Sequence, residues 1–406
     1  MRLPIDGHLA LPVMTVLGRL RMPFVRGLCD GAQRHFLSIR AADLLRNRIN
    51  QARVPTGSEF FALLQVSALR RFGLLFSGNA MIPLDRLEPI GRDLRRPECV
   101  LCTSDGVLHV ADWRGGVTLI APDGRQETVL ARGDFKPQPN GIAILPEGGW
   151  LLAHLGETEG GVYRLAPDGT LTDVMLEVAG VPLPPTNYVH LDAGGRMWVT
   201  VSTRRQPRNL GYRPDCDDGF IVLRDKNAAR IVADGLGYTN ECVIHPETGQ
   251  LFVNETFARR LTSFDVGAEG DLSARATIAE FGAGTFPDGL TFDHMGGIWI
   301  TSIVSNRVIR VAPDGRQTVV IEDANADDLA RVEAAFLSGE MGRPHLDRSF
   351  GARLGNISSA AFGGADMKTV YLGCLLGHEI VHFRSDIAGL KPAHWNWTAA
   401  AREVFG

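Results

Sequence analysis

Carboxylate and amide side chains recur along this chain at the starts of short apolar segments. The clearest case is Asp288–Gly289, which opens the apolar run 290–292 and is followed by a glycine turn at 295–297 and a second apolar run. Polar residues open five similar segments, and the full set is Glu98, Asn140, Asn187, Asn240, Asp288 and Ser358. Carboxylate and amide oxygens are hard donors, which suit Ca²⁺ or another hard divalent cation.

The charges in this set favour the same chemistry. Glu98 and Asp288 bring two negative charges that a divalent cation would neutralise, whereas without a cation one of two facing carboxyl groups would take up a proton. At any single position the alternative is that Asn and Asp begin strands because they suit turns. Four donors together, at Glu98, Asn187, Asn240 and Asp288, favour a shared ligand over four independent turns.

The elements that must position these residues are repeats with a period of about 40–50 residues, which is typical of propeller blades or a solenoid. Each copy contains an apolar second strand, and the six second strands are expected at 107–112, 150–154, 197–201, 251–255, 298–301 and 370–373. A third strand follows each one, and most copies continue through a turn such as Pro313–Asp314–Gly315 into a fourth strand. Six repeats of four strands predict an all-β fold, a six-bladed β-propeller. A solenoid is disfavoured because its shorter rungs rarely carry four strands.

The polar set falls at the start of the innermost strand of each predicted blade. The first residues of six inner strands face the same end of a propeller channel, so six polar side chains are expected to point at one axis. Residues 87–89, which precede the first repeat, are expected to pair with the last blade and close the ring.

Three segments lie outside the repeats. Residues 1–80 hold eleven Arg, no Lys and four acidic residues, with short helical patches. This stretch is interpreted as an accessory or anchoring extension, or as the product of an upstream start, with Met81 as the true first residue. Within the propeller, 81–395, an insertion at about 322–350 contains a helical pattern at 325–337 that could cap a channel mouth or decorate the rim. Residues 396–406 form a C-terminal tail.

Composition excludes several function classes. The net charge of −4 and the absence of a basic stripe after residue 80 argue against nucleic-acid binding. No apolar run reaches the ~18 residues of a membrane span. The six cysteines are interpreted as buried free thiols in a reducing, cytoplasmic compartment. Nothing in the sequence indicates an oligomeric state.

These residues also carry a resemblance to a known family. Over about residues 83–395 the chain resembles the SMP-30/gluconolactonase/LRE-like, or regucalcin-like, family. The resemblance rests on Arg96–Pro97–Glu98, Pro139–Asn140–Gly141, Asn187, Thr239–Asn240, 287–289 with 297–299, and 361–366 with 369–371. It implies that Glu98, Asn187, Asn240 and Asp288 bind one divalent metal ion, with Ca²⁺ preferred over Zn²⁺, Mn²⁺ or Mg²⁺.

The substrate pocket is expected beside this ion. The resemblance places Asn140 near the substrate. Family members often have Asn–Asp where this chain has Asn187–Tyr188, and Asn–Gly where it has Asn240–Glu241, so Tyr188 and Glu241 are expected to reshape the pocket. His154, which follows the second strand of blade two, is the best histidine candidate for a substrate contact.

The favoured function is metal-dependent hydrolysis of a sugar lactone or similar cyclic ester. The resemblance implies that the ion polarises the carbonyl and lowers the pKa of a water, which Asp288 orients or deprotonates. No G-x-S-x-G motif indicates a serine nucleophile. Two alternatives stay open: a non-catalytic metal- or ligand-binding propeller, and a strictosidine-synthase-like enzyme on the same scaffold.

Overall fold

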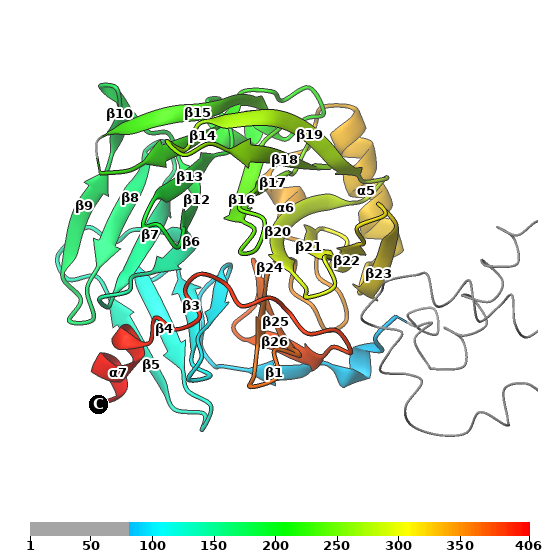
Figure 1. Cartoon of the computed structure of the whole chain (residues 1–406). Helices are drawn as coiled ribbons and strands as arrows, with labels where there is room; N and C mark the ends of the chain where they lie inside the picture. Colours follow the sequence, from blue (N-terminus) through cyan, green and yellow to red (C-terminus); the bar gives the residue numbers. More distant parts are fainter. Residues whose placement is uncertain (1–80, 227) are drawn as a thin grey trace, which may run out of the picture. The chain divides into compact units, whose positions relative to one another are not determined.

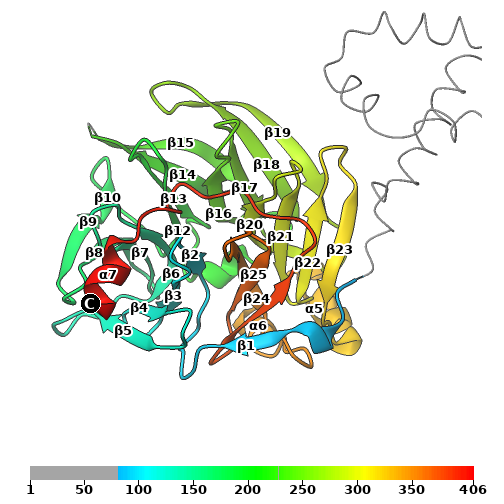
Figure 2. The ribbon, with the colours of Figure 1, turned by 60° about the horizontal axis from the view of Figure 1, so that its bottom comes forward.

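The computed structural model describes residues 81–226 and 228–406, so the predictions for residues 1–80 lie outside the described residues. Six four-stranded antiparallel sheets surround a common axis (Figures 1 and 2). This arrangement is a six-bladed β-propeller, which confirms the predicted fold class.

Within each blade, successive strands run from the axis outward. Blade 1 contains β2 (Val100–Cys102), β3 (Leu108–Asp112), β4 (Gly116–Ile120) and β5 (Gln126–Leu130). Blade 2 contains β6 (Pro139–Ile144), β7 (Trp150–Leu155), β8 (Gly160–Leu165) and β9 (Leu171–Met175). Blade 3 contains β12 (Thr186–Leu191), β13 (Met197–Val201), β14 (Gly219–Arg224) and β15 (Ala229–Leu236). A two-stranded ribbon, β10 (Glu177–Val178) and β11 (Val181–Pro182), joins blades 2 and 3.

The second half of the ring repeats this order. Blade 4 contains β16 (Thr239–Ile244), β17 (Leu251–Glu255), β18 (Arg260–Val266) and β19 (Leu272–Glu280). Blade 5 contains β20 (Phe286–Phe292), β21 (Ile298–Ile303), β22 (Arg307–Val311) and β23 (Gln317–Glu322). Blade 6 contains β24 (Ile357–Gly363), β25 (Thr369–Cys374), β26 (Ile380–Arg384) and, as its outermost strand, β1 (Glu88–Ile90).

The ring closes by pairing the two ends of the propeller sequence. β1 follows a short 3₁₀ turn, η1 (Leu84–Arg86), and runs antiparallel to β26 with Glu88 opposite His382 and Ile90 opposite Ile380. The expected closure by residues 87–89 is therefore confirmed, with a shift of one residue. Closure removes the free sheet edges that an open array would leave.

Apolar side chains from adjacent blades fill the space between sheets. The second strands of blades 1 to 5 are buried along their whole length, and the rings of Trp299 in blade 5 and Phe362 in blade 6 meet edge to face with centroids 5.1 Å apart. Outer strands such as β19 are mostly exposed. Five cysteines are buried free thiols, as predicted, and Cys29 lies outside the described residues. Within residues 81–406, apart from 227, no helix is long and apolar enough to cross a membrane.

Buried carboxylates fix the turns that lead out of two inner strands. The Asp293 side chain accepts hydrogen bonds from the Gly297 amide (2.9 Å), the Trp299 indole (2.8 Å) and the Arg310 guanidinium (2.6 Å). Burial alone would raise the pKa of Asp293, but these hydrogen bonds lower it below its usual value. Asp192 binds the equivalent turn of blade 3. Asp293 therefore ties its turn to the second and third strands of blade 5, and Asp192 ties its turn to the second strand of blade 3.

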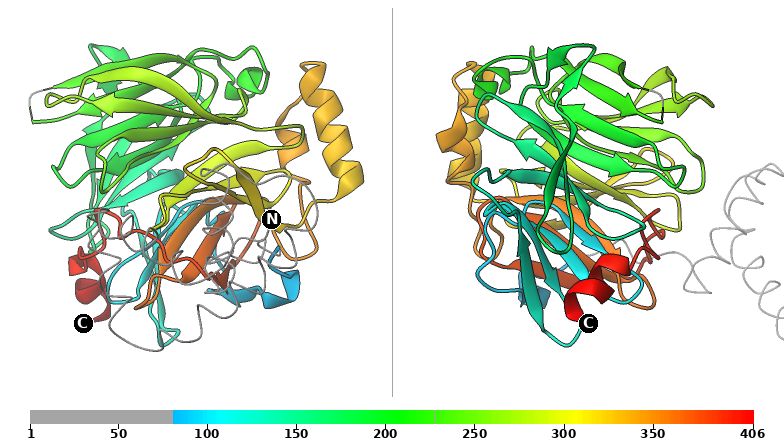
Figure 3. Two further views of the ribbon diagram at one scale, coloured as in Figure 1. Left: turned by 45° about the vertical axis from the view of Figure 1, so that its right-hand side comes forward. Right: turned by 90° about the vertical axis from the view of Figure 1, so that its left-hand side faces the viewer.

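The insertion and the C-terminal segment lie on opposite sides of the ring in both views of Figure 3. α5 (Ala326–Leu337) begins at Asn325, whose side chain accepts a hydrogen bond from the Asp328 amide (3.0 Å), and α6 (Arg343–Leu346) follows it. Phe336 of α5 packs edge to face against Phe286, close to the start of β20 (5.2 Å). At the other side, α7 (Ala399–Phe405) packs on the core of blades 1 and 2.

We expect Asp293→Ala to lower the free energy of unfolding by about 3–5 kcal/mol, because it leaves the buried Arg310 guanidinium without its counter-ion. Urea unfolding followed by circular dichroism measures the change. Asp123→Ala is the matched control, since Asp123 pairs with Arg125 in an exposed turn and should matter little. Equal effects of the two substitutions would contradict the role given to Asp293.

Two buried imidazoles predict a loss of stability in mild acid. Burial lowers the pKa of His109 and His190 to about 4, whereas unfolded histidine titrates near 6.5. Above pH 6.5 both states are neutral, and below it the unfolded state binds protons that the folded state excludes. Each histidine should therefore cost about 2 kcal/mol of stability at pH 5 relative to pH 7. Urea midpoints test this, and imidazole NMR signals titrating near pH 6.5 in the folded protein would contradict it.

Candidate metal and active site

The predicted polar ring gathers at one end of the channel. Asn140, Asn187, Asn240, Asp288 and Ser358 lie at the beginnings of the inner strands β6, β12, β16, β20 and β24, and Glu98 lies just before β2. In all five of those strands the pairing with the second strand shifts register at or beside the polar residue. A bulge of this kind re-aims a side chain, so the same local irregularity, repeated around the ring, turns the polar residues towards the mouth.

The ring residues are buried, with exposed fractions from 1% for Ser358 to 6% for Glu98. Ser358 donates through its hydroxyl to the Glu98 carbonyl (2.8 Å) and so joins blade 6 to blade 1. A buried side-chain polar atom normally has a hydrogen-bond partner. An amide atom of this ring that has no hydrogen-bond partner in the protein therefore points to a ligand.

Three amide oxygens of the ring are buried without any hydrogen-bond partner. They are the Oδ1 atoms of Asn140, Asn187 and Asn240. In Asn240 the amide nitrogen is held by the Thr256 hydroxyl (3.1 Å), which itself donates to the Pro287 carbonyl (2.8 Å). The amide nitrogen of Asn240 is therefore bound within the blade, whereas its amide oxygen has no hydrogen-bond partner. Unpartnered buried oxygens of this kind fit a cation that accepts their lone pairs.

The two carboxylates of the ring, Glu98 and Asp288, bring an excess of negative charge to the site. Burial, with Glu98 and Glu241 nearby, raises the pKa of Asp288 well above its usual value, while Arg96 and a hydrogen bond from Asn240 act against the rise. Glu98 is paired with Arg96 at 2.8 Å. A divalent cation held by Glu98, Asn187, Asn240 and Asp288 would relieve this repulsion, so the donor chemistry fits the predicted ion. In the part of the chain described, no three His, Cys, Asp or Glu side chains form a metal cluster, because half of this donor set is amide.

His154 also lies at this end of the channel. It is the last residue of β7 that pairs with β6, and it lies directly opposite Pro139, the neighbour of Asn140. Its Nδ1 accepts a hydrogen bond from the Gln138 amide (2.9 Å), and its Nε2 is buried without a hydrogen-bond partner, 3.9 Å from Glu159. Burial lowers the pKa of His154 despite that carboxylate. A neutral imidazole with a free nitrogen beside Asn140 is available to a ligand.

Tyr188 and Glu241 lie deeper than the ring. Both line a channel cavity of about 60 Å³ that the C-terminal segment borders with Leu390 and His394. The Tyr188 ring packs on Gly141, where a Cβ atom would overlap it. Glu241 accepts a hydrogen bond from the Leu290 amide (3.1 Å), and burial raises its pKa to about 8. The β-bulges thus leave Asn187 and Asn240 at the mouth and direct the residues that follow them, Tyr188 and Glu241, into the channel.

Several residues near the mouth were missed by the sequence analysis. Arg208 and Tyr212 lie between β13 and β14, around the 3₁₀ turn η2 (Arg208–Gly211), and Arg343 lies in α6. Electrostatic contacts link Arg208 and Arg343 to Arg96, and Arg208 to Glu98. One feature of the sequence could have indicated Arg208 and Tyr212, namely the long interval between the second and third strands of blade 3, from Val201 to Gly219. Long loops often carry binding residues.

Fold and site define this chain as a β-propeller with a polar ring on its channel axis. Within that class, a family model described as the SMP-30/gluconolactonase/LRE-like region matches residues 97–326. The chain belongs to this family, which confirms the resemblance drawn from the sequence.

Individual relatives are more distant. A 6-deoxy-6-sulfogluconolactonase from Pseudomonas putida is 28% identical over 133 residues, which cover 32% of this chain and 43% of that protein. The match therefore spans less than half of that relative's length. Among solved structures, a gluconolactonase from Xanthomonas campestris is 18% identical, with a TM-score of 0.52 over 72% of this chain and 87% of that one. The calcium-binding protein regucalcin from Agrobacterium tumefaciens is 15% identical, with a TM-score of 0.54 over 77% and 96%. At these identities the structures show a shared fold.

We expect Ca²⁺ to raise the melting temperature of the protein, because binding to the folded state alone adds about 2.7 kcal/mol at one hundred times Kd. Asn187→Leu should abolish that rise while leaving the melting temperature in EDTA nearly unchanged, since Oδ1 of Asn187 has no protein partner to lose. Differential scanning fluorimetry with EDTA and with Ca²⁺ measures both effects.

Asn356→Leu is the matched control for this prediction. Asn356 is equally buried, but its amide accepts from Val304 (2.7 Å) and donates to the Leu346 carbonyl (2.8 Å). Its loss should destabilise the protein with or without Ca²⁺. If Asn187→Leu behaves like Asn356→Leu in EDTA, the Asn187 amide is structural.

Proposed function

We propose that this protein is a divalent-metal-dependent hydrolase of a sugar lactone or a similar cyclic ester. The observation that carries the proposal is the pairing of two buried carboxylates with three unpartnered amide oxygens at one channel mouth. Family membership supports it, as do the names of relatives that act on gluconolactones.

In this proposal Glu98, Asn187, Asn240 and Asp288 hold the cation. When bound, a divalent cation supplies a Lewis acid that polarises a carbonyl oxygen and lowers the pKa of water. The four donors come from four different blades, so their spacing is set by the closed ring and not by any one loop. Such a rigid set keeps its geometry while substrate binds and leaves.

Asp288 acts as the proton carrier. Its carboxylate takes a proton from the water whose oxygen attacks the lactone carbonyl carbon. The carbon–oxygen bond of the ring then breaks, and the same proton passes from Asp288 to the departing ring oxygen, which becomes a hydroxyl group of the acid product. Asn140 and His154 are placed to bind sugar hydroxyls, since each presents a free buried polar atom at the mouth. Tyr188 and Glu241 shape the floor beneath the substrate.

Hydrolysis of aldonolactones, followed by a pH indicator, tests the proposal. Purified protein should hydrolyse at least one lactone, lose activity after EDTA treatment and dialysis, and regain it on addition of a divalent cation. Asp288→Asn should lower kcat by about 10²–10⁴-fold, the usual contribution of general acid–base catalysis, while keeping the wild-type far-ultraviolet circular dichroism.

Asp123→Asn controls for the loss of an acidic side chain, because Asp123 lies in an exposed turn of blade 1. Full activity after chelation would refute the metal, and full activity of Asp288→Asn would refute its role. Metal binding without turnover of any lactone would favour the non-catalytic binding propeller instead.

A further inference from the structure

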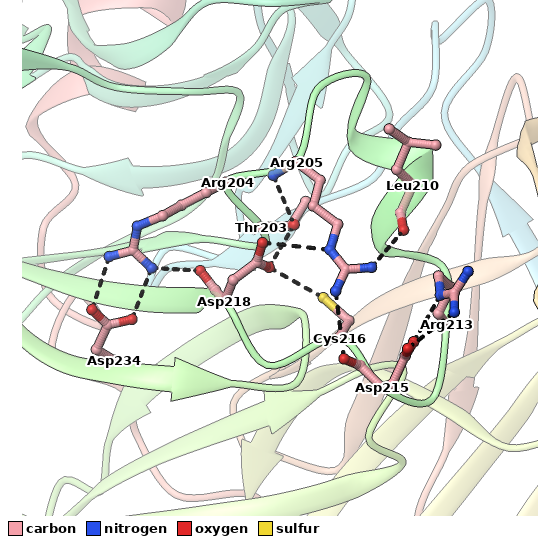
Figure 4. A network of polar contacts seen from close by, with 9 residues as sticks. All are labelled: Thr203, Arg204, Arg205, Leu210, Arg213, Asp215, Cys216, Asp218 and Asp234. Atoms are coloured by element: carbon pink, nitrogen blue, oxygen red, sulfur yellow. Dashed lines mark hydrogen bonds and ion pairs between the residues drawn. The ribbon is translucent and has the colours of Figure 1, made fainter.

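The loop between β13 and β14 leaves the sheet at the site end, where Val201 pairs with Thr186 beside Asn187, and a network of polar contacts holds this loop (Figure 4). Asp218 accepts a hydrogen bond from Thr203 (2.6 Å) and pairs with Arg205 (3.6 Å). Arg204 forms a two-pronged contact with Asp234 on β15 (2.8 and 2.9 Å). Ion pairs that share partners and span a loop fix its shape better than isolated surface pairs do. The residues this loop carries are therefore positioned before any ligand arrives.

The loop presents Arg208 beside the polar ring. Tyr212, Tyr238 and Phe257 form an aromatic cluster with ring centroids 4.7–5.5 Å apart, and Arg208 lies near the two tyrosines. Although burial opposes it, Tyr212, Tyr238 and Glu98 raise the pKa of Arg208 above its usual value. Yet Arg208, which is half-buried, makes no ion pair with any carboxylate of the described chain. These neighbours keep Arg208 charged, and because no carboxylate of the described residues forms an ion pair with it, its guanidinium group is available to an anionic ligand.

Two further guanidinium groups converge on the same place. Arg96 stacks over Trp113 (4.3 Å), pairs with Glu98 and has a left-handed backbone, with φ of 46°. Non-glycine residues in that region are strained, and strain of this kind gathers at functional sites. Arg343 and Arg208 both act electrostatically on Arg96, so the two lie near it. Arg343 itself pairs with Asp347 (2.8 Å).

The charges at the mouth leave a positive excess once the ring is satisfied. A divalent cation balances Glu98 and Asp288, and Asp347 balances Arg343. Arg96 and Arg208 then remain as two positive charges beside the lactone position. They come from blade 1 and from the β13–β14 loop, with Arg343 supplied by the insertion, so three separate segments contribute to one electropositive wall.

We propose that this wall is an anion subsite, so that the substrate is a lactone carrying a second, acidic group remote from the ring carbonyl. This inference rests on the proposed lactonase function. A carboxylate, sulfonate or phosphate on the sugar would pair with Arg208, with the charge of Arg96 nearby, while the carbonyl lies over the polar ring. Guanidinium groups suit such anions because they donate two parallel hydrogen bonds.

The first experiment compares lactones that differ in charge. Values of kcat/KM are measured for glucono-1,5-lactone and for its 6-phospho and 6-sulfo forms, and for glucaro-1,4-lactone as the carboxylate. The wild-type protein should favour at least one charged lactone by tenfold or more, and 0.5 M NaCl should reduce that preference. A neutral lactone hydrolysed as well as all three charged ones would overturn the subsite.

Substitutions test whether Arg208 is responsible for the preference for charged lactones. Arg208→Gln should bring the ratio of charged to neutral kcat/KM close to one, mainly through KM, and Arg208→Lys should keep part of it. Arg213→Gln is the matched control, because Arg213 lies on the same loop but pairs with Asp215 (2.7 Å) at an exposed position. Retention of the full preference in Arg208→Gln, or its loss in Arg213→Gln, would count against the assignment.

A binding measurement separates this inference from the proposed function. Isothermal titration of Ca²⁺-loaded protein with 6-phosphogluconate and with gluconate needs no turnover. Tighter binding of the phosphorylated acid, weakened at least tenfold in Arg208→Gln, supports the subsite even if no lactone is hydrolysed, and the lactonase proposal alone then fails. Equal binding of the two acids, or none, overturns the subsite whatever the lactone assays show.

Discussion

Electrostatic repulsion between Glu98 and Asp288 is the constraint around which the site end of the propeller is built. The two carboxylates are far apart in sequence and meet because the ring closes through β1 and β26. The chain accommodates them by pairing Glu98 with Arg96 and by favouring the protonated form of Asp288. A cation that binds between them relieves the repulsion in the folded state alone. Metal binding and ring stability are therefore linked in the proposed mechanism.

The repeat made the fold readable from the sequence. Each blade is a local meander, so apolar periodicity and turn residues such as Pro313–Asp314–Gly315 identify it without knowledge of distant contacts. Once six blades are counted, closure follows, and the first residues of the inner strands must meet. The gathering of Asn187, Asn240 and Asp288 could thus be predicted by position alone. Their roles as ligands remain a proposal that their burial and unpartnered oxygens support.

Single-residue register was harder to predict. The sequence analysis grouped Tyr188 and Glu241 with the substrate pocket because family members often carry other residues at these two positions. The β-bulges place them in the channel cavity below the mouth. A bulge depends on how one strand pairs with the next, and an isolated Asn–Tyr or Asn–Glu pair gives little sign of it. Arg208 and Arg343 were missed for a related reason, because they lie in segments that do not repeat, and only tertiary packing brings them together.

These two kinds of residue imply a separation between chemistry and selectivity. The ring residues are fixed by strand ladders that also hold the propeller together, so changing them disturbs the axis. Arg208 is fixed by the salt-bridge network of its own loop, and Arg343 by an insertion that packs through Phe336 on Phe286. Loop and insertion can alter in length and charge while the inner strands β12, β16 and β20 stay intact in their three blades. If both proposals hold, the non-repeating segments select the charge of the substrate, and the repeats determine which bond is broken.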